Sequence, residues 1–200
     1  PVDRRQRQMC IRDRYYPKNG ENMHDAVQRE SKAARDSAGI LDASTLGKID
    51  IQGTDASEFL NRVYTNAWSK LAIGKCRYGL MLNEDGMVYD DGVTTRLDEN
   101  HYIMTTTTGG AATVLGKLED YLQTEWPELD VYLTSVTDHY ATVSVCGPNS
   151  KKIVSQVIPD LDFSDENFPH MSFKNAKIGS IKCRVMRISF TGEHLSLIHI

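Results

Sequence analysis

The pattern of apolar and polar positions predicts short helices and strands in alternation. Residues 21–39 place apolar or small side chains at helical intervals, with Asp25 near the start and Gly39 as a glycine stop. Residues 48–52 alternate as a strand does. A second helix begins near Thr54, whose hydroxyl we expect to cap it. The buried face of this helix is expected to consist of Phe59, Leu60 and Val63.

The rest of the chain is predicted to form two groups of strands separated by one amphipathic helix. Residues 76–108 indicate three strands, and Asp85-Gly86 supplies the positive φ that a tight hairpin turn needs. Residues 109–129 predict a helix that stops at Pro127. Two more strands, a short helix and a hairpin are predicted at 131–138, 140–147, 147–159 and 172–193. Strand pairs that alternate with single helices indicate an α+β fold with mixed or antiparallel sheets and flanking helices.

The two ends of the chain do not share this pattern. "MCIRD" in residues 9–13 can be written in codons as ATG TGT ATA AGA GAC AG, whose reverse complement reads Leu-Ser-Leu-Ile-His-Ile. Those are the last six residues, so we interpret 1–14 and 195–200 as non-native tails derived from a sequencing adapter. The alternatives are a basic nucleic-acid-binding arm at the start and an apolar strand at the end.

This interpretation changes the charge balance. Residues 1–14 carry five arginines and two aspartates, so without them the formal net charge of −4 becomes −7. An acidic chain does not suggest a nucleic-acid or anionic-membrane partner. No apolar run approaches the ~20 residues of a membrane span. The remaining length of about 180 residues suits one domain or two small ones.

The cysteines and histidines give no sign of a metal site. Outside the tails there are three widely spaced cysteines, Cys76, Cys146 and Cys183, and they are expected to be buried apolar side chains. The histidines between Tyr15 and Glu193 are His24, His101, His139 and His170. Their spacing matches no common ligand set, so no metal is expected.

Two adjacent aspartates stand inside a predicted strand, in "MVYDDGVTT". Asp is a poor strand residue, and neighbours on a strand point to opposite faces, so only one of Asp90 and Asp91 can face a given cleft. The structural alternative is a sheet edge or bulge protected by charge. Gly92 next to them suggests a bulge or a close backbone approach.

Two further segments are weaker candidates for a site. "TTTTGG", residues 105–110, precedes a predicted helix and can be either an anion-binding loop or a capping loop. "FTGE", residues 190–193, ends a strand with a glycine and a carboxylate, Glu193. Neither a P-loop lysine nor a G-x-G-x-x-G motif is present, so nucleotide binding has little support.

Long blocks from Tyr15 to Glu193 carry a family resemblance. The clearest are "AARDSAGILDASTLGKIDIQGTDASEFLNRVYTNAW", "YGLMLNEDGMVYDDGVTT", "HYIMTTTTGGAA", "LQTEWPELDVYLTSVTDHYATVSVCGPNS" and "RISFTGE". Together they resemble the carboxy-terminal part of the alpha subunits of heterotetrameric sarcosine oxidases, which is similar to the glycine-cleavage aminomethyltransferases. The resemblance implies an incomplete aminomethyltransferase folate-binding fold.

The resemblance also implies roles for five residues. Asp90 corresponds to the essential aspartate of the family's G-x-x-x-D-D strand, although Asp85 stands where these transferases usually have the first glycine. Glu193 corresponds to the glutamate that holds the pterin ring of folate. By position, the residues expected to line the folate cleft are Tyr78, Thr106 and Thr107.

The implied reaction passes the methyl carbon of oxidised sarcosine to tetrahydrofolate, which yields methylenetetrahydrofolate and glycine. FAD, FMN and NAD are expected elsewhere in a cytoplasmic complex, whose other subunits would be the partners. The isolated fragment is expected to be inactive. The alternatives are a fragment of a glycine-cleavage aminomethyltransferase or dimethylglycine dehydrogenase, or a non-catalytic folate-binding module.

The expected domain boundaries follow from the same resemblance. Residues 15–50 and 138–194 are expected to form a first, truncated folate-binding subdomain. Residues 51–137 are expected to form a second α+β subdomain inserted into it. The tails, 1–14 and 195–200, are left outside both.

Overall fold

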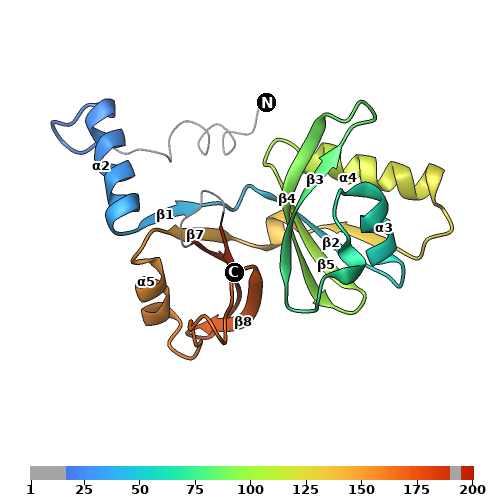
Figure 1. Ribbon diagram of the computed structural model, residues 1–200. Coiled ribbons are helices and arrows are strands. Elements are labelled where there is room, and N and C mark those ends of the chain that lie inside the picture. Colours follow the sequence, from blue (N-terminus) through green and yellow to red (C-terminus); the bar gives the residue numbers. More distant parts are fainter. Residues whose placement is uncertain (1–16, 190–194) are drawn as a thin grey trace. The chain divides into compact units, whose positions relative to one another are not determined.

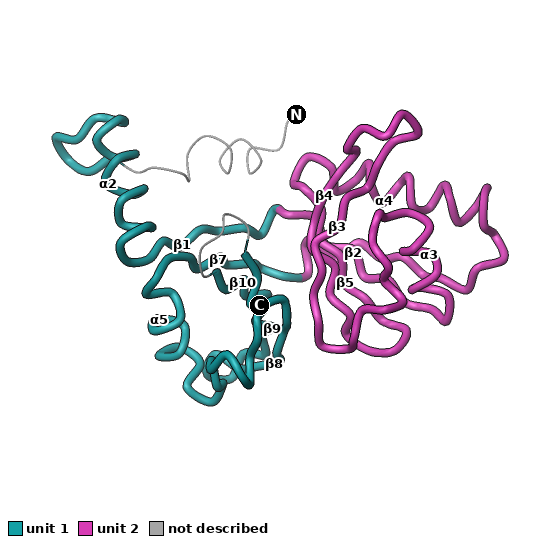
Figure 2. The backbone as a smooth tube through the Cα atoms, in the orientation of Figure 1, with its two compact units in different colours: residues 1–45, 140–200 teal, residues 46–139 magenta. Residues whose placement is uncertain are grey.

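The computed structural model describes residues 17–189 and 195–200 and divides the chain into two compact units. Unit 1 comprises residues 1–45 and 140–200, and unit 2 comprises residues 46–139 (Figure 2). Each unit contains one five-stranded sheet, in which all neighbouring strands are antiparallel. The predicted α+β class is therefore confirmed, with antiparallel rather than mixed sheets.

The elements of unit 2 hold the residues of the candidate site (Figure 1). Its sheet has the strand order β3-β4-β5-β2-β6. The strands are β2 (Gly47–Gln52), β3 (Cys76–Leu82), β4 (Val88–Asp98), β5 (His101–Thr106) and β6 (Tyr132–Ser135). The helices are α3 (Ala56–Val63), the 3₁₀ turn η1 (Trp68–Lys70), α4 (Ala111–Asp120), the π-helical turn η2 (Tyr121–Glu125) and the 3₁₀ turn η3 (Thr137–His139).

Both α-helices of unit 2 pack on the same face of the sheet. Phe59 and Leu60 of α3 are fully buried, as the sequence pattern predicted, and they join Val114 and Leu118 of α4. The sheet contributes its own buried side chains to this core, namely Ile49, Ile51, Met81, Tyr102 and Met104. The alternation of each strand thus directs every second residue toward the helices.

Two details of the predicted helices were wrong. Thr54 does not cap α3, because its hydroxyl donates to Asp130 Oδ2 at 3.1 Å and Asp55 is the residue at the cap. The first helix, α2 (Met23–Asp36), ends before Gly39. Gly39 instead begins strand β1 (Gly39–Asp42), which the pattern did not predict.

Unit 1 contains the second sheet, with the strand order β1-β7-β10-β9-β8. Besides α2 and β1, its elements are β7 (Thr142–Cys146), α5 (Ser150–Val157), β8 (Ser172–Ile178), β9 (Ile181–Ile188) and β10 (Leu195–His199). The predicted hairpin at 172–193 is present as β8 and β9, joined at Gly179 with φ of 61°. Val154 and Ile158 pack with Val185 in the core of this unit.

The last residues of the chain occupy a strand position in unit 1. β10 pairs with both β7 and β9, and Ile198 is buried in the core. An apolar six-residue segment with β-branched residues can form a strand between two others whatever its origin. The adapter origin of the tails therefore stays a prediction, and residues 1–16 lie outside the described part of the chain.

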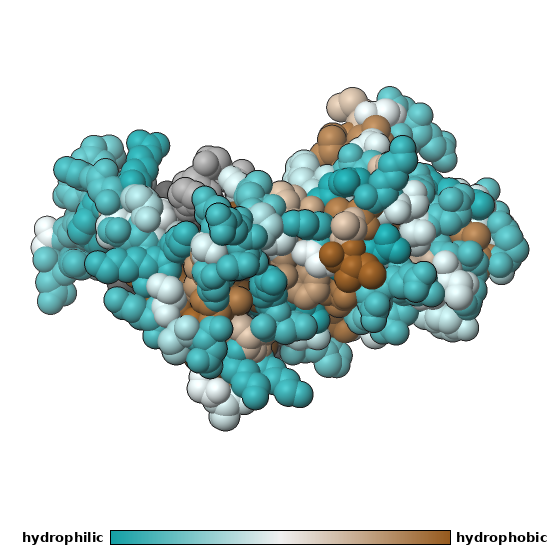
Figure 3. Space-filling model, turned by 60° about the horizontal axis from the view of Figure 1, so that its bottom comes forward, coloured by the Kyte–Doolittle hydropathy of each residue, from teal (hydrophilic) through white to brown (hydrophobic). Residues whose placement is uncertain are grey.

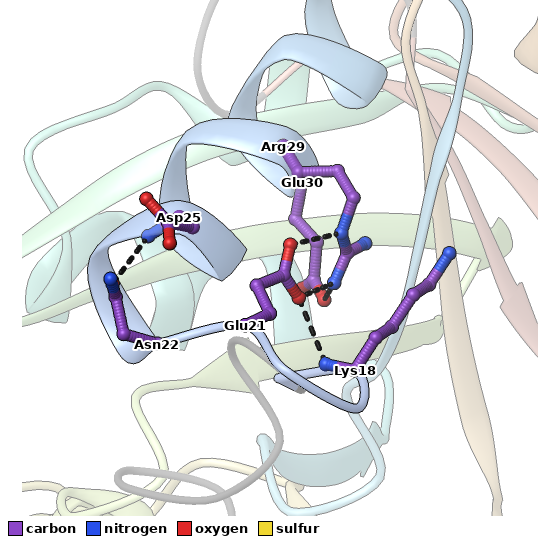
Figure 4. A network of polar contacts seen from close by, with 6 residues as sticks. All are labelled: Lys18, Glu21, Asn22, Asp25, Arg29 and Glu30. Carbon is purple, nitrogen blue, oxygen red and sulfur yellow. Dashed lines mark hydrogen bonds and ion pairs between the residues drawn. The ribbon is translucent and has the colours of Figure 1, made fainter.

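The start of α2 is stabilised by local polar contacts (Figure 4). Asn22 caps the helix by accepting a hydrogen bond from the backbone N–H of Asp25 at 3.0 Å. The Glu21 carboxylate accepts from Arg29 Nε at 2.9 Å and from the backbone N–H of Lys18 at 2.9 Å. These two donors, Arg29 first, lower the pKa of Glu21 to about 2. Ion pairs at the protein surface add little stability.

The surface is mainly hydrophilic on the face shown in Figure 3, with hydrophobic groups in a few patches. Large apolar side chains that remain exposed in unit 2 include Ile73, Tyr78, Met87 and Val88. Among the described residues, no helix is both long enough and apolar enough to cross a membrane.

Candidate active site

The two adjacent aspartates of β4 point to opposite faces of the sheet of unit 2. In the β3–β4 pairing, Asp90 lies opposite Met81 and Asp91 lies opposite Leu80. Met81 belongs to the core beneath the helices, so Asp90 shares that face. Asp90 is only 4% exposed, whereas Asp91 on the other face is half-buried.

The Asp90 carboxylate is held at the beginning of helix α4. Its Oδ1 accepts a hydrogen bond from the Thr107 hydroxyl at 2.6 Å, and its Oδ2 accepts one from the Thr107 backbone N–H at 3.2 Å. The Thr107 hydroxyl in turn accepts from the backbone N–H of Gly110 at 3.1 Å. Burial raises the pKa of Asp90, and the neighbouring charge of Asp91 adds to this, while the Thr107 hydrogen bonds oppose it.

A side chain at position 110 would collide with this arrangement. A Cβ on Gly110 would lie 2.5 Å from Asp90 Oδ1 and 2.8 Å from the Thr107 hydroxyl oxygen. Gly110 is the residue that precedes α4, with φ of −83°. The glycine is therefore needed for space and not for its conformational freedom.

Tyr78 on β3 is paired with the second aspartate. Tyr78 lies opposite Val93, so Asp91, two residues earlier on β4, is its diagonal neighbour on the same face. The Tyr78 hydroxyl donates to Asp91 Oδ2 at 2.6 Å. This hydrogen bond is the main reason that the pKa of Tyr78 is raised to about 12. Tyr78 remains 46% exposed, so a ligand can reach this face of the pair.

Strand β3 is held in place beside the pair by close packing. A Cβ on Gly79 would lie 2.6 Å from the buried Trp68 ring, so this ring packs directly against the strand backbone. The Asn66 side-chain amide donates to the Tyr78 carbonyl at 2.6 Å. Tyr64 stacks edge to face on Trp68, with ring centroids 5.9 Å apart. Burial first, and then the charges of the two aspartates, raise the pKa of Tyr64.

Gly92, directly after the aspartates, lies where β4 approaches β5 closely. A Cβ there would be 1.9 Å from the Thr105 carbonyl oxygen. The Thr105 hydroxyl also accepts from the Val93 backbone N–H at 2.9 Å and donates to the Val93 carbonyl at 3.1 Å. The irregularity in the β3–β4 pairing falls earlier, where Tyr89 is the unpaired residue. Gly92 is therefore explained by the close approach of the two backbones and not by a bulge.

Thr106 and Glu193 are the remaining predicted site residues. Thr106 is only 2% exposed, and its hydroxyl donates to the Thr107 carbonyl at 2.9 Å. Its side chain also lies against the backbone of Gly47, where a Cβ would be 2.0 Å from its hydroxyl oxygen. Glu193 lies outside the described residues.

Unit 1 contains a cavity of about 740 Å³. Its lining includes Tyr140, Asn175, Cys183, Arg184 and His199. Asp90 and Tyr78 belong to unit 2 and do not contribute to it. Across residues 17–189 and 195–200, no group of three or more His, Cys, Asp or Glu side chains is arranged to hold a metal ion.

Comparison with known protein families shows which family the chain belongs to. A family model described as the GCVT N-terminal domain matches residues 7–195. The chain belongs to the GCVT N-terminal domain family. The match takes in the site in unit 2 and nearly all of unit 1.

Sarcosine oxidase alpha subunits and aminomethyltransferases are both similar to this GCVT N-terminal domain chain. It is 57% identical over 180 residues to the sarcosine oxidase subunit alpha of Corynebacterium sp. (strain U-96), which covers 90% of the chain. It is 31% identical over 172 residues, or 84% of the chain, to an aminomethyltransferase of Listeria monocytogenes serotype 4a (strain HCC23). The chain spans 19% of the length of the first relative and 44% of the second.

A solved structure supports the fold of the GCVT N-terminal domain chain. The glycine cleavage system aminomethyltransferase T from Bartonella henselae matches with a TM-score of 0.76 and 21% sequence identity. The match covers 98% of this chain and 52% of that protein. The predicted aminomethyltransferase fold is thereby confirmed.

In this GCVT N-terminal domain, the family resemblance assigned the catalytic role to Asp90, and sequence reasoning gave no role to Asp91. The period-two alternation of a strand implied that only one of the two could face a cleft, but it did not say which. The signal that distinguishes them is the pairing of β3 with β4, which places Asp91 beside Tyr78.

Proposed function

We propose that this chain is a folate-binding, one-carbon transfer module of a sarcosine oxidase alpha subunit. In this proposal it passes the methyl carbon of oxidised sarcosine to tetrahydrofolate. The observation that carries the proposal is the pair of β4 carboxylates, one accessible beside Tyr78 and one buried beside Thr107. A transfer of this kind needs a fixed negative charge where a cation develops.

The difference in sequence identity favours an alpha subunit over a stand-alone aminomethyltransferase. Identity to the Corynebacterium alpha subunit is 57%, compared with 31% for the Listeria aminomethyltransferase, over segments of similar length. As a module of an alpha subunit, the chain would work together with further domains and subunits. Those partners would supply the oxidation of sarcosine.

Tetrahydrofolate would supply the nitrogens that accept the one-carbon unit. The protein's part is to stabilise positive charge and to hold or move a proton at the reacting nitrogen. Asp91 is suited to both tasks because it lies on the accessible face. The Tyr78 hydroxyl occupies Asp91 Oδ2, and a carboxylate offers about four acceptor sites in total, so Asp91 retains capacity for a substrate N–H.

Asp90 is less accessible to a substrate. It is 4% exposed, and Thr107 donates to both of its carboxylate oxygens. The family resemblance nevertheless assigns the essential aspartate to Asp90, and it assigns pterin binding to Glu193. Experiment must therefore distinguish the two aspartates.

Parallel substitutions Asp90→Asn and Asp91→Asn separate the two assignments. In the complete multi-subunit protein, we expect Asp91→Asn to lower the yield of methylenetetrahydrofolate about 10²- to 10⁴-fold, the usual contribution of a general acid or base. Asp90→Asn is expected to have a smaller effect. Tetrahydrofolate affinity, measured by calorimetry, should change little in either variant.

The exposed Asp98 at the end of β4 provides the control, because Asp98→Asn removes one charge from the same strand. A loss of yield confined to Asp90→Asn would instead assign the catalytic role to Asp90. Unchanged yield in both variants, or failure of the parent protein to bind tetrahydrofolate, would refute the proposed function.

A further inference from the structure

We propose that Asp90 and Thr107 form a clamp that positions Asp91 against Tyr78. Asp90 is then a positioning residue, and Thr107 acts on the reaction only through it. This inference rests on the proposed function for the role of Asp91 in catalysis. The clamp itself can be tested without any folate.

The clamp has the features of a built structural contact. Thr107 donates its hydroxyl and its backbone N–H to the two oxygens of one carboxylate, which fixes both the position and the rotation of Asp90. The same hydroxyl accepts from Gly110 N–H, so the clamp is tied to the residue that precedes α4. A helix N-terminus carries partial positive charge, which favours the ionised form of a carboxylate held there.

The clamp is placed where it can control Asp91. The two aspartates are neighbours on β4 and point to opposite faces, so a rotation of the strand that frees Asp90 also turns Asp91. The β3–β4 pairing is irregular on one side of them, at Tyr89, which weakens the regular ladder as a restraint there. On the other side, the close approach of Gly92 to Thr105 holds the strand.

The position of Asp91 can be measured through Tyr78. The raised pKa of Tyr78, about 12, depends first on its hydrogen bond to Asp91. We would place 3-fluorotyrosine at position 78 of the 200-residue chain and follow its ionisation by ¹⁹F NMR. All variants carry the same label, so differences in pKa between them report changes in the Tyr78–Asp91 contact.

Thr107→Val removes the hydroxyl and keeps the shape of the side chain. We expect the pKa of residue 78 to fall by one to two units relative to the labelled parent, a ~10- to 100-fold change in the acid dissociation constant. Thr107→Ser restores the hydroxyl and should restore the parent value. Thr124→Val is the matched control. The Thr124 hydroxyl donates to the backbone carbonyl of Asp120, and neither residue belongs to the clamp.

The inference is overturned if folded Thr107→Val retains the parent pKa at position 78. It is also overturned if the Thr124→Val control shows the same fall. If Thr107→Val does not fold, as judged by tryptophan fluorescence, Gly110→Ala tests the clamp by placing a methyl 2.5 Å from Asp90 Oδ1, with the same two outcomes. Failure of tetrahydrofolate to bind would refute the proposed function but would leave the clamp in place.

Discussion

The close approach of β4 to β5 at Gly92 leads to a sharp prediction for Gly92→Ala. A Cβ at this position would lie 1.9 Å from the Thr105 carbonyl oxygen and 2.7 Å from the Thr105 carbonyl carbon. Cβ atoms essentially never approach other heavy atoms closer than 3.0 Å, so the two backbones must separate by about 1 Å. The obstacle is backbone, which cannot rotate away as the end of a side chain can.

The expected cost follows from the kind of atom that must move. Overpacking a well-filled site costs about 1–3 kcal/mol, and a backbone obstacle places Gly92→Ala at the upper end, near 3 kcal/mol. The separation also strains the two hydrogen bonds between the Thr105 hydroxyl and the Val93 backbone. Gly116 in α4 provides the matched control, since a Cβ there meets nothing within 4 Å. Gly116→Ala should stabilise the helix by up to about 1 kcal/mol.

Urea unfolding monitored by tryptophan fluorescence measures both effects. The chain has two tryptophans, Trp68 and Trp126, and both lie in unit 2, so the signal reports that unit alone. With a urea m-value of about 1–3 kcal/mol/M, a loss of 3 kcal/mol lowers the midpoint by about 1–3 M. A Gly92→Ala midpoint equal to that of the parent would show that the close approach does not constrain the strand.

Two further predictions concern carboxylates. Burial raises the pKa of Asp90 above its ordinary value of 3.8, so the folded chain retains this proton after the unfolded chain has lost it. The stabilising contribution of the protonated group is therefore present below pH 3.8 and lost as pH rises through the raised pKa. The Asp90→Asn variant should lack this loss of stability with rising pH. Urea midpoints measured from low pH upward test this, and stability profiles that run parallel for the parent and the variant would contradict it. Glu193→Gln should weaken tetrahydrofolate binding, because an amide has one acceptor oxygen where a carboxylate has two for a pair of parallel donors. Equal affinity by calorimetry would count against a pterin-binding role.

The sequence by itself determined the features that depend on neighbouring residues. Gly86 has φ of 79° in the turn after Asp85, as the Asp-Gly pair predicted. The apolar spacing of residues 56–63 placed Phe59 and Leu60 in the core before any partner was known. Local backbone preference and side-chain periodicity decide such features, and both can be read within a short window. Long family blocks similarly predicted the aminomethyltransferase fold.

Contacts between distant segments were decided only by the tertiary structure. The Thr54 hydroxyl could have capped α3, but it donates a hydrogen bond to Asp130, 76 residues later, instead. Thr107 was predicted from position to line a cleft, and only the structure shows that its hydroxyl donates to Asp90, 17 residues earlier. A polar side chain near a helix start has several possible partners of similar energy. The one that forms depends on which groups the packed core brings within about 3 Å.

The choice between the two aspartates is decided in the same way. Strand alternation requires them to face apart, and this much is contained in the sequence. Which of them meets Tyr78 depends on the register of β3 against β4, and a shift of one residue would exchange their faces. That register is set by packing, such as Met81 in the core and Gly79 against Trp68. The identity of the carboxylates was therefore a property of the sequence, and their environment a property of the fold.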